Sequence, residues 1–394
     1  MTARPRRGVL RRVLPLILLG ALAAQVTPAR AATASFTDVP PGYWAASAIR
    51  SVAIDHNWMR DFGPSSFRPS GPEARKRLAR AVVRAFAPAE AVDRTIHFTD
   101  LPSDDAFFRF ANVAVKLGWM NAPHGAFHPD RAVRTVALHR TLLAAVGLHD
   151  VVDGINAIHT ADGYHVPHPG RLGAMLAGML LGFRYDHDDN SLDVDPSTRV
   201  PRSEVAWSLA HAYVANTTEA WRKTALAPYA TIELGRLSPA MRKAAAFGLR
   251  FVGYPYVYAG EWNTASPAGY CCGYQSRGGF DCSGLMWWVM KAPQSGYDNT
   301  FVRPYRGWPL PERSSRDMAG AIPRSERIGM AQLRPGDLMF YDGSGDGVVD
   351  HVDLYLGRGW ALDSSNGSGG VVIVRAKTGW YADHFKWGRD IVRG

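Results

Sequence analysis

The spacing of hydrophobic residues changes character near residue 240. Upstream, apolar positions recur at helical intervals in residues 78–86, 136–146 and 205–214, with turns rich in Gly, Pro and Asp between them. Downstream, a helical pattern gives way to short runs in which apolar and polar residues alternate, starting at residue 338. The pattern predicts a multidomain α+β protein, with a helical array first and then a domain that packs helices on an antiparallel sheet.

The helical half contains an internal repeat. Residues 36–40 (FTDVP) return as residues 98–102 (FTDLP), and a weaker third copy ends in the helical segment 205–214. A period of about 60 residues is typical of an array whose units bury their faces against each other. We expect three units, each with two helices, and their predicted bounds are 36–87, 98–147 and 152–217.

Residues 218–239 show no strand pattern, and Pro228 and Pro239 interrupt any long helix. We interpret this stretch as a linker. The second domain then spans residues 240–394, which is long enough to bury a core of its own.

The N-terminus carries the strongest charge bias. The formal net charge is +10, yet residues 1–31 hold six Arg and no acidic residue, which leaves +4 for the rest of the chain. An arginine-rich start, the apolar run 13–26 and a small-residue ending at Ala31 form the pattern of a signal peptide. We predict that residues 1–31 direct export by the Sec or the twin-Arg route; the alternative is a membrane anchor, for which the run is short. The remaining charge is too small for the electrostatic footprint of a nucleic-acid-binding protein.

The three cysteines, Cys271, Cys272 and Cys282, lie close together in the second half. Their odd number leaves at least one free thiol in an exported protein. Cys282 follows Asp281, a good N-cap residue, and precedes the apolar run 285–290. At the start of a helix the unpaired N–H groups and the positive dipole end favour the nucleophilic thiolate. An inert, buried cysteine ahead of a core helix is the alternative.

The predicted strands bring a base within reach of such a thiol. His351 opens the alternating segment 351–357, and Asp363 lies on the strand that follows it. A helix that carries Cys, packed on an antiparallel sheet that carries His and a polar residue, can assemble a nucleophile, a base and an orienting group.

Several motifs in this half resemble the NlpC-type cell-wall cysteine peptidases, which have a papain-like fold. The matching segments are 255–260 (PYVYAG), 281–284 (DCSG), 310–315 (LPERSS), 334–338 (RPGDL) and 351–357 (HVDLYLG). The resemblance implies that Cys282 attacks the substrate carbonyl and that His351 carries the proton. Asp363 stands where the family most often has a second His, and a carboxylate there can orient the imidazole. Asn366 is the fallback for this third role.

The same resemblance implies roles for residues around the thiol. Tyr256 would place its hydroxyl near the developing oxyanion, beside the backbone N–H of Cys282. Asp281 and Ser283 would hold the amino end of the substrate peptide.

The sequence departs from this family in two places. An insertion at residues 261–280, which contains Cys271 and Cys272, is expected to form a loop at the rim of the cleft. Asp353 stands where the family prefers a small residue. Its carboxylate would either perturb His351 or point to solvent.

The N-terminal units resemble surface-layer homology (SLH) repeats, which bind secondary cell-wall polysaccharide. The Thr-Arg-Ala-Glu stretch of that family corresponds to residues 201–204 (PRSE) in the third copy and 74–77 (ARKR) in the first. The resemblance implies polymer binding through Arg75, Arg202 and Glu204, and a planar guanidinium suits carboxylate-bearing sugars. The alternative is a helical spacer.

Two patterns suggest metal binding, but neither makes a convincing site. Residues 342–353 match much of a calcium-loop pattern but lie between two predicted strands, so we interpret them as a Gly- and Asp-rich hairpin connection. No convincing ligand set is formed by His124, His128, His165 and His168. We predict no metal, and thiol chemistry needs no organic cofactor.

These observations predict a secreted, cell-wall-associated peptidoglycan hydrolase. Its expected partners are peptidoglycan stem peptides and, through the repeats, a wall polysaccharide. In the family that the second half resembles, the usual bond joins γ-D-Glu to a diamino acid and is cleaved through a Cys thioester. Two alternatives stay open: a wall-anchored binding protein with a silent peptidase domain, and amidase or transpeptidase chemistry on the same fold.

Overall fold

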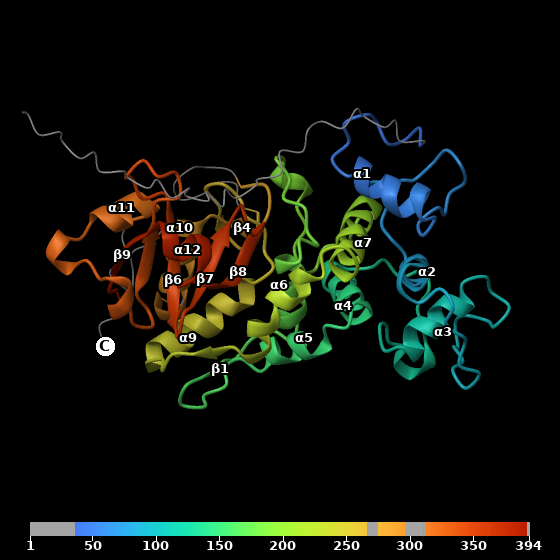
Figure 1. Cartoon of the computed structure of the whole chain (residues 1–394), viewed down its shortest axis with the longest axis horizontal. Helices are drawn as coiled ribbons and strands as arrows, with labels where there is room; N and C mark the ends of the chain where they lie inside the picture. Colours follow the sequence, from blue (N-terminus) through green and yellow to red (C-terminus); the bar gives the residue numbers. More distant parts are fainter. Residues whose placement is uncertain (1–35, 266–274, 296–309, 311, 392–394) are drawn as a thin grey trace, which may run out of the picture. The chain divides into compact units, whose positions relative to one another are not determined.

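The computed structural model describes residues 36–265, 275–295, 310 and 312–391 (Figure 1). The predicted signal peptide and the pair Cys271 and Cys272 lie outside the described residues. Within the described ranges, no helix is long and apolar enough to cross a membrane.

Helices are the main regular elements of residues 36–217. They are α1 (Ala46–Ile49), α2 (Arg75–Phe86), α3 (Phe108–Lys116), α4 (Thr135–Ala145), α5 (His149–Asn156), α6 (Leu172–Leu180) and α7 (Arg202–Asn216), and α1 runs into a π-helical turn at Arg50–Asp55. The three predicted helical segments correspond to α2, α4 and α7. Their apolar side chains at helical spacing, such as Leu78, Leu142 and Leu209, are fully buried. Hydrophobic periodicity therefore located these helices correctly.

The segments before α2, α4 and α7 pair with one another in a closed ring. The N–H of Val133 donates to the carbonyl of Glu73 (2.8 Å), Val200 donates to Val133 (2.9 Å), and Glu73 donates to Val200 (3.1 Å). This cyclic pairing satisfies backbone groups at the centre of the array, and it requires three equivalent segments. The three copies are therefore equivalent in space, while their assignment to the SLH family stays a prediction.

The predicted linker contains short regular elements. Helix α8 (Trp221–Ala225) and a 3₁₀ turn (Ala227–Thr231) lead into β2 (Glu233–Leu234). Strand β2 pairs in parallel with β1 (His159–Thr160) of the third repeat. The domain bounds drawn from the sequence stay predictions.

A five-stranded antiparallel sheet organises the C-terminal part. Its strands are β5 (Leu338–Tyr341), β6 (His351–Gly357), β7 (Trp360–Ser365), β8 (Gly370–Arg375) and β9 (Phe385–Arg389), in the order β8-β7-β6-β5-β9. The other elements of this part are α9 (Pro239–Gly248), β3 (Glu261–Trp262), β4 (Gly279–Phe280), α10 (Cys282–Ser295), α11 (Ser315–Gly320) and α12 (Gly379–His384). The alternating runs that start at residue 338 correspond to β5, β6, β7 and β8, whereas the sequence pattern missed β9, a short, partly polar strand that pairs with β5 at the edge.

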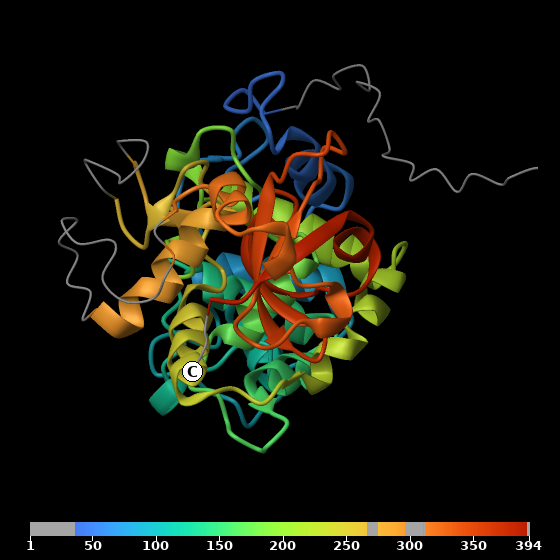
Figure 2. The same ribbon diagram turned by 90° about the vertical axis from the view of Figure 1, so that its left-hand side faces the viewer.

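Helix α10 packs against β6 and β7 (Figure 2). Residues 282–290 are all buried, as the apolar pattern around this helix predicted. Because α10 packs against the sheet, Cys282 at the start of the helix lies near His351 at the start of β6.

Candidate active site

Cys282 is the first residue of α10 and is a buried free thiol. The carboxylate of Asp281 accepts hydrogen bonds from the N–H of Gly284 and from the hydroxyl of Ser283. The prediction that Asp281 caps this helix is thereby confirmed. Capping fixes the start of the helix, and with it the position of the thiol at the positive end of the dipole.

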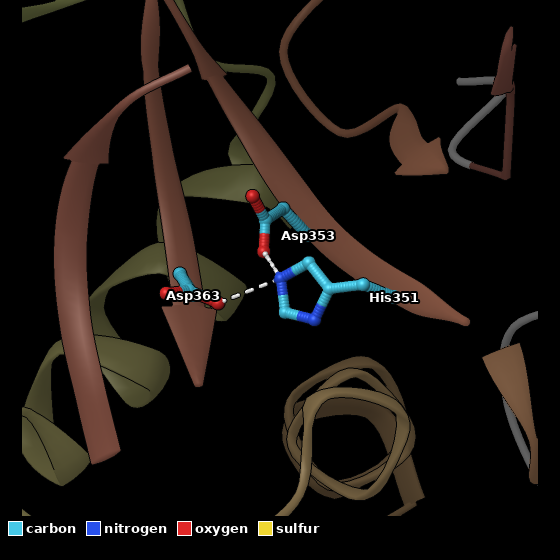
Figure 3. A group of neighbouring side chains, drawn as sticks. All are labelled: His351, Asp353 and Asp363. Atoms are coloured by element: carbon cyan, nitrogen blue, oxygen red, sulfur yellow. Dashed lines mark ion pairs between the residues drawn. The ribbon is translucent and has the colours of Figure 1, made fainter. Parts of the chain in front are cut away.

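His351 opens β6 and contacts two buried carboxylates through one ring nitrogen. Its Nε2 lies 3.0 Å from an oxygen of Asp363 and 3.1 Å from an oxygen of Asp353 (Figure 3). The other ring nitrogen points away from both carboxylates, and Cys282 is among the neighbouring groups that raise the pKa of the same imidazole. The structure thus brings together the thiol, the base and the carboxylate that the sequence selected, and adds a second carboxylate.

Strand geometry explains why both carboxylates reach the imidazole. Residues two apart on a strand point to the same face, so Asp353 lies beside His351. The register of β6 and β7 pairs Leu354 with Leu362 and therefore brings Asp363 opposite Asp353.

The two carboxylates control the charge of the imidazole. Burial of His351 disfavours its charged form, but Asp353 first and then Asp363 and Cys282 overcome this cost and raise the pKa of His351 well above its ordinary value. An imidazolium at this position is the natural partner of a thiolate.

Asp363 is anchored by two hydroxyl groups. Its second oxygen accepts hydrogen bonds from Tyr381 (2.9 Å) and Ser365 (2.8 Å). Although burial alone would raise it, contacts with His351 hold the pKa of Asp363 below its ordinary value. Asn366, the fallback for this role, is exposed in the turn after β7. Asp363, and not Asn366, is therefore the residue in contact with the imidazole.

Tyr256 lies within the electrostatic reach of the thiol. Burial first, and then the negative charges of Cys282 and Asp281, raise the pKa of Tyr256, so its hydroxyl stays protonated. A neutral hydroxyl beside the nucleophile can donate a hydrogen bond to an oxyanion.

Asp281 and Ser283, the predicted substrate holders, are joined by a buried arginine. Arg313 donates to Ser283 (2.8 Å) and to Asp281 (3.1 Å), while its Nε donates to Glu261 (2.6 Å). The sequence placed Arg313 in a matching motif but gave it no role. Its bonds fix the two residues that flank Cys282 in the chain.

Comparison with known families identifies the family of the domain that contains Cys282, His351 and Asp363. Residues 253–389 match the model of the NlpC/P60 family. This part of the chain is an NlpC/P60 domain. The predicted papain-like α+β architecture with an antiparallel sheet is confirmed for the domain.

Relatives share this part of the chain. The bifunctional muramidase/DL-endopeptidase CwlT of Bacillus subtilis (strain 168) is 28% identical over 137 residues, which cover 34% of this chain and 32% of that protein. The murein DD-endopeptidase MepH of Escherichia coli (strain K12) is 29% identical over 146 residues, 36% of this chain and 42% of that protein. A crystal structure of an NlpC/P60 family protein from Bacillus cereus ATCC 10987 is 25% identical, with 39% of this chain and 40% of that chain covered and a TM-score of 0.28. The chain thus spans less than half the length of each of these proteins.

The residues predicted to bind wall polymer do not form one site. Arg202 is 1% exposed, and its guanidinium binds Glu73 (2.5 Å), Asp61 (2.9 Å) and two backbone carbonyls. Glu204 is buried against Nε2 of His187 (2.7 Å). These internal contacts correct the prediction, because they leave neither Arg202 nor Glu204 exposed to a polymer. Arg75 alone stays partly exposed.

The calcium-like loop of the NlpC/P60 domain uses its acidic residues for other contacts. Asp342 accepts backbone N–H groups of Gly345 and Gly347, and Asp350 accepts those of Gly343 and Ser344. The loop connects two antiparallel strands, so its interpretation as a hairpin connection is confirmed.

Among the residues that the structure describes, a single His/carboxylate group has the spacing of a cation site, and it is His351, Asp353 and Asp363. Its members contact each other directly through the imidazole nitrogen that faces both carboxylates. We therefore interpret the group as part of the proton machinery of the NlpC/P60 domain.

Proposed function

We propose that the chain is a secreted, wall-associated peptidoglycan hydrolase that acts as a cysteine endopeptidase on stem peptides. The observation that carries the proposal is a buried free thiol, Cys282, close enough to raise the pKa of His351, whose Nε2 faces two buried carboxylates inside an NlpC/P60 domain. Desolvated charge partners of this kind are typical of catalytic sites.

In the first half of the reaction, the Cys282 thiolate attacks the carbonyl carbon of the scissile amide. The negative charge moves to the carbonyl oxygen, where the backbone N–H of Cys282 and the hydroxyl of Tyr256 stabilise it. The imidazolium of His351 then donates its proton to the leaving nitrogen. The C–N bond breaks, the amine departs, and the acyl group remains on sulfur as a thioester.

In the second half, neutral His351 takes a proton from water, and the resulting hydroxide attacks the thioester. Collapse of the second tetrahedral intermediate expels Cys282 as a thiolate beside the imidazolium, so the starting state returns. Asp363 keeps the ring nitrogen that it faces protonated and directs the other toward the thiol in both steps.

The bond that we propose joins γ-D-Glu to a diamino acid. The relative named as a DL-endopeptidase supports this cleavage site. The relative named as a DD-endopeptidase supports a different one, a bond between two D-centres.

The test is mass spectrometry of a defined muropeptide after incubation with the reduced, mature protein, beside the variant Cys282→Ala. We expect fragments split after D-Glu, and we expect none with the variant. Fragments split between sugar and peptide would assign an amidase, and fragments split between D-residues a DD-endopeptidase. An intact muropeptide with both proteins would support a silent domain.

A second function is favoured by one feature of the repeats. A cavity of about 420 Å³ is lined by residues that include Arg75, Arg140 and Trp119. Backbone carbonyls hold both guanidinium groups, through Asn121 for Arg75 (2.7 Å) and Gly170 for Arg140 (2.7 Å). Two positioned guanidinium groups beside an aromatic ring suit an acidic sugar.

We propose that this cavity binds an acidic wall polysaccharide. Sedimentation with purified cell walls, before and after chemical removal of their polysaccharide, tests the proposal. Binding should require the polysaccharide and should weaken in the variant Arg75→Ala/Arg140→Ala. Equal sedimentation of the variant, or no dependence on the polysaccharide, would make the repeats a spacer.

A further inference from the structure

Asp353 and Asp363 form a cross-strand pair of acidic residues in the interior. Both side chains are fully buried, and each has an oxygen within about 3 Å of Nε2 of His351. Like charges directly opposite each other on neighbouring strands repel, and burial without water strengthens the repulsion. A single imidazolium offers one positive charge to the pair. Two ionised carboxylates therefore form an unbalanced cluster.

The surroundings of the two carboxylates differ. Asp363 is held by the hydroxyls of Tyr381 and Ser365. Within the described residues, neither oxygen of Asp353 accepts a hydrogen bond of ordinary geometry, although the phenol of Tyr341 lies close to this carboxylate. Because an ionised carboxylate needs such bonds when buried, the proton is expected on Asp353 and the charge on Asp363.

We propose that Asp353 is a positioning residue that shares one proton with Asp363 behind His351, so that the imidazole faces one negative charge when the proton is bound and two when it has left. The inference rests on the proposed function, since it assigns His351 the role of base for Cys282. It adds a second carboxylate to the site and makes the strength of the imidazolium–thiolate pair depend on the state of Asp353.

Electrostatic balance supports this assignment. Burial and then the charge of Asp363 raise the pKa of Asp353 to about 7, close to neutrality. Asp353 is also the strongest of the groups that raise the pKa of His351. When Asp353 loses its proton, the imidazolium is held more firmly, and the thiolate beside it is favoured over the neutral pair.

The groups that face Asp353 come from every element packed around it. His351 lies on its own strand, Asp363 on β7, Tyr341 on β5 and Tyr381 on α12. Burial first, and then Asp353 and Asp363, raise the pKa of Tyr341, and burial followed by Asp363 and Asp353 does the same for Tyr381. Both phenols therefore stay neutral at the pH values at which Asp353 titrates. The change in charge is confined to the two carboxylates, the imidazole and Cys282.

The experiment follows the rate at which iodoacetamide alkylates Cys282 as a function of pH. Trypsin separates this cysteine from Cys271 and Cys272 because Arg277 lies between them, so mass spectrometry reads Cys282 by itself. The rate rises when the thiolate–imidazolium pair forms and changes again when the imidazolium loses its proton. The assay needs no substrate, so it tests Asp353 even if the muropeptide is not cleaved.

We expect the wild-type profile to contain an inflection near pH 7 from Asp353. In Asp353→Asn this inflection should vanish. The second inflection, at which the imidazolium of His351 loses its proton, should move to lower pH by about 1–3 units, because a neighbouring carboxylate is lost. The matched control is Asp337→Asn, since Asp337 is a buried acid at the start of β5 whose pKa burial raises to about 6, away from the imidazole. It should leave the profile unchanged.

The outcomes separate a positioning role from a merely structural one. Superimposed profiles for wild type and Asp353→Asn, or an equal shift in Asp337→Asn, would overturn the proposal. If circular dichroism shows that Asp353→Asn does not fold, Asp353→Ser takes its place. If neither variant folds, a wild-type profile without an inflection near neutrality overturns it.

Discussion

The two halves of the described chain bury charged groups in opposite ways. In the repeats, the guanidinium of Arg202 meets the carboxylates of Glu73 and Asp61 and the carbonyls of Phe67 and Met59, all at 2.5–3.0 Å. In the NlpC/P60 domain, one imidazole meets two carboxylates, and one of these has no other partner of ordinary geometry among the described residues. The first cluster pairs two guanidinium groups, of Arg202 and Arg80, with two carboxylates, and it joins the first and the third repeat. The second cluster has two carboxylates against one imidazole, and we propose that it therefore exchanges a proton.

The largest effect should come from removing the base of the unbalanced cluster. His351→Ala deletes the group that we propose both activates Cys282 and protonates the leaving amine, so we expect kcat to fall by about 10⁴ or more. Muropeptide hydrolysis followed by mass spectrometry measures the loss. Because the variant retains the repeats, its sedimentation with cell walls should equal that of the wild type. Retention of more than about a tenth of the activity would remove His351 from the mechanism.

Disruption of the Arg202 cluster should lower the stability of the protein and leave the reactivity of Cys282 unchanged. Arg202→Ala leaves Glu73 buried without its cation, while Asp61 keeps its ion pair with Arg80, and breaking a buried pair in this way costs about 3–5 kcal/mol. Thermal unfolding followed by circular dichroism measures the change. The rate of Cys282 alkylation below the transition should be unchanged, since the lost group lies in the other half of the chain.

Arg75→Ala is the control for that comparison, because Arg75 occupies the equivalent position at the start of α2. Its Nε donates to the carbonyl of Phe127 (2.9 Å), just as Nε of Arg202 donates to that of Phe67 (2.8 Å). Truncation of Arg75 strands no buried carboxylate among the described residues, so its cost should be about 1 kcal/mol. Equal destabilisation by both variants would show that the carbonyl contacts, and not the ion pairs, stabilise the array.

These two arginines also show where prediction from sequence ends. The motif match selected Arg75 and Arg202 together because the residue type and the spacing agree. Burial of Arg202 depends on Glu73 and Asp61, more than 120 residues earlier in the chain, and nothing local to residues 201–204 signals it. Helical periodicity, in contrast, located α2, α4 and α7, because the pattern of a helix is set by neighbours three and four residues apart.

The active site likewise contains residues that the sequence predicts and one, Asp353, whose direction it does not predict. Cys282, His351 and Asp363 were predictable because each opens or lies on an element with a clear pattern, and the structure brings them close together. The alternation of β6 already places Asp353 on the face of His351, but its position opposite Asp363 depends on the register between β6 and β7. Register is a property of the folded sheet, so the sequence left the direction of Asp353 open.

The unbalanced cluster should also make stability depend on pH. The pKa of Asp353 is raised in the folded state to about 7 from an ordinary value of 3.8. Its contribution to stability is therefore fully present below about pH 4 and is lost as the pH rises through 7. Asp353→Asn lacks this titration. Between pH 5 and pH 8 we expect the wild type to lose about 1–3 kcal/mol more than the variant, measured by urea unfolding at the two pH values. Parallel losses in both proteins would contradict the assignment of the proton.

The smallest effect should come from the anchors of Asp363. Tyr381→Phe removes one of the two hydroxyl donors to this carboxylate, while Ser365 keeps the other. A single hydrogen bond to a charged group is worth about 1.5–3 kcal/mol at most, and the remaining anchor preserves much of the orientation, so kcat/KM should fall by about threefold to tenfold. Ser365→Ala should have a similar effect, and the double variant should lose more than the sum of the two free-energy changes, because the carboxylate is then free to turn away from His351. If the free-energy changes of the two single variants add strictly, the register of the sheet alone positions Asp363. Both charged clusters would then depend on the backbone more than on their side-chain partners.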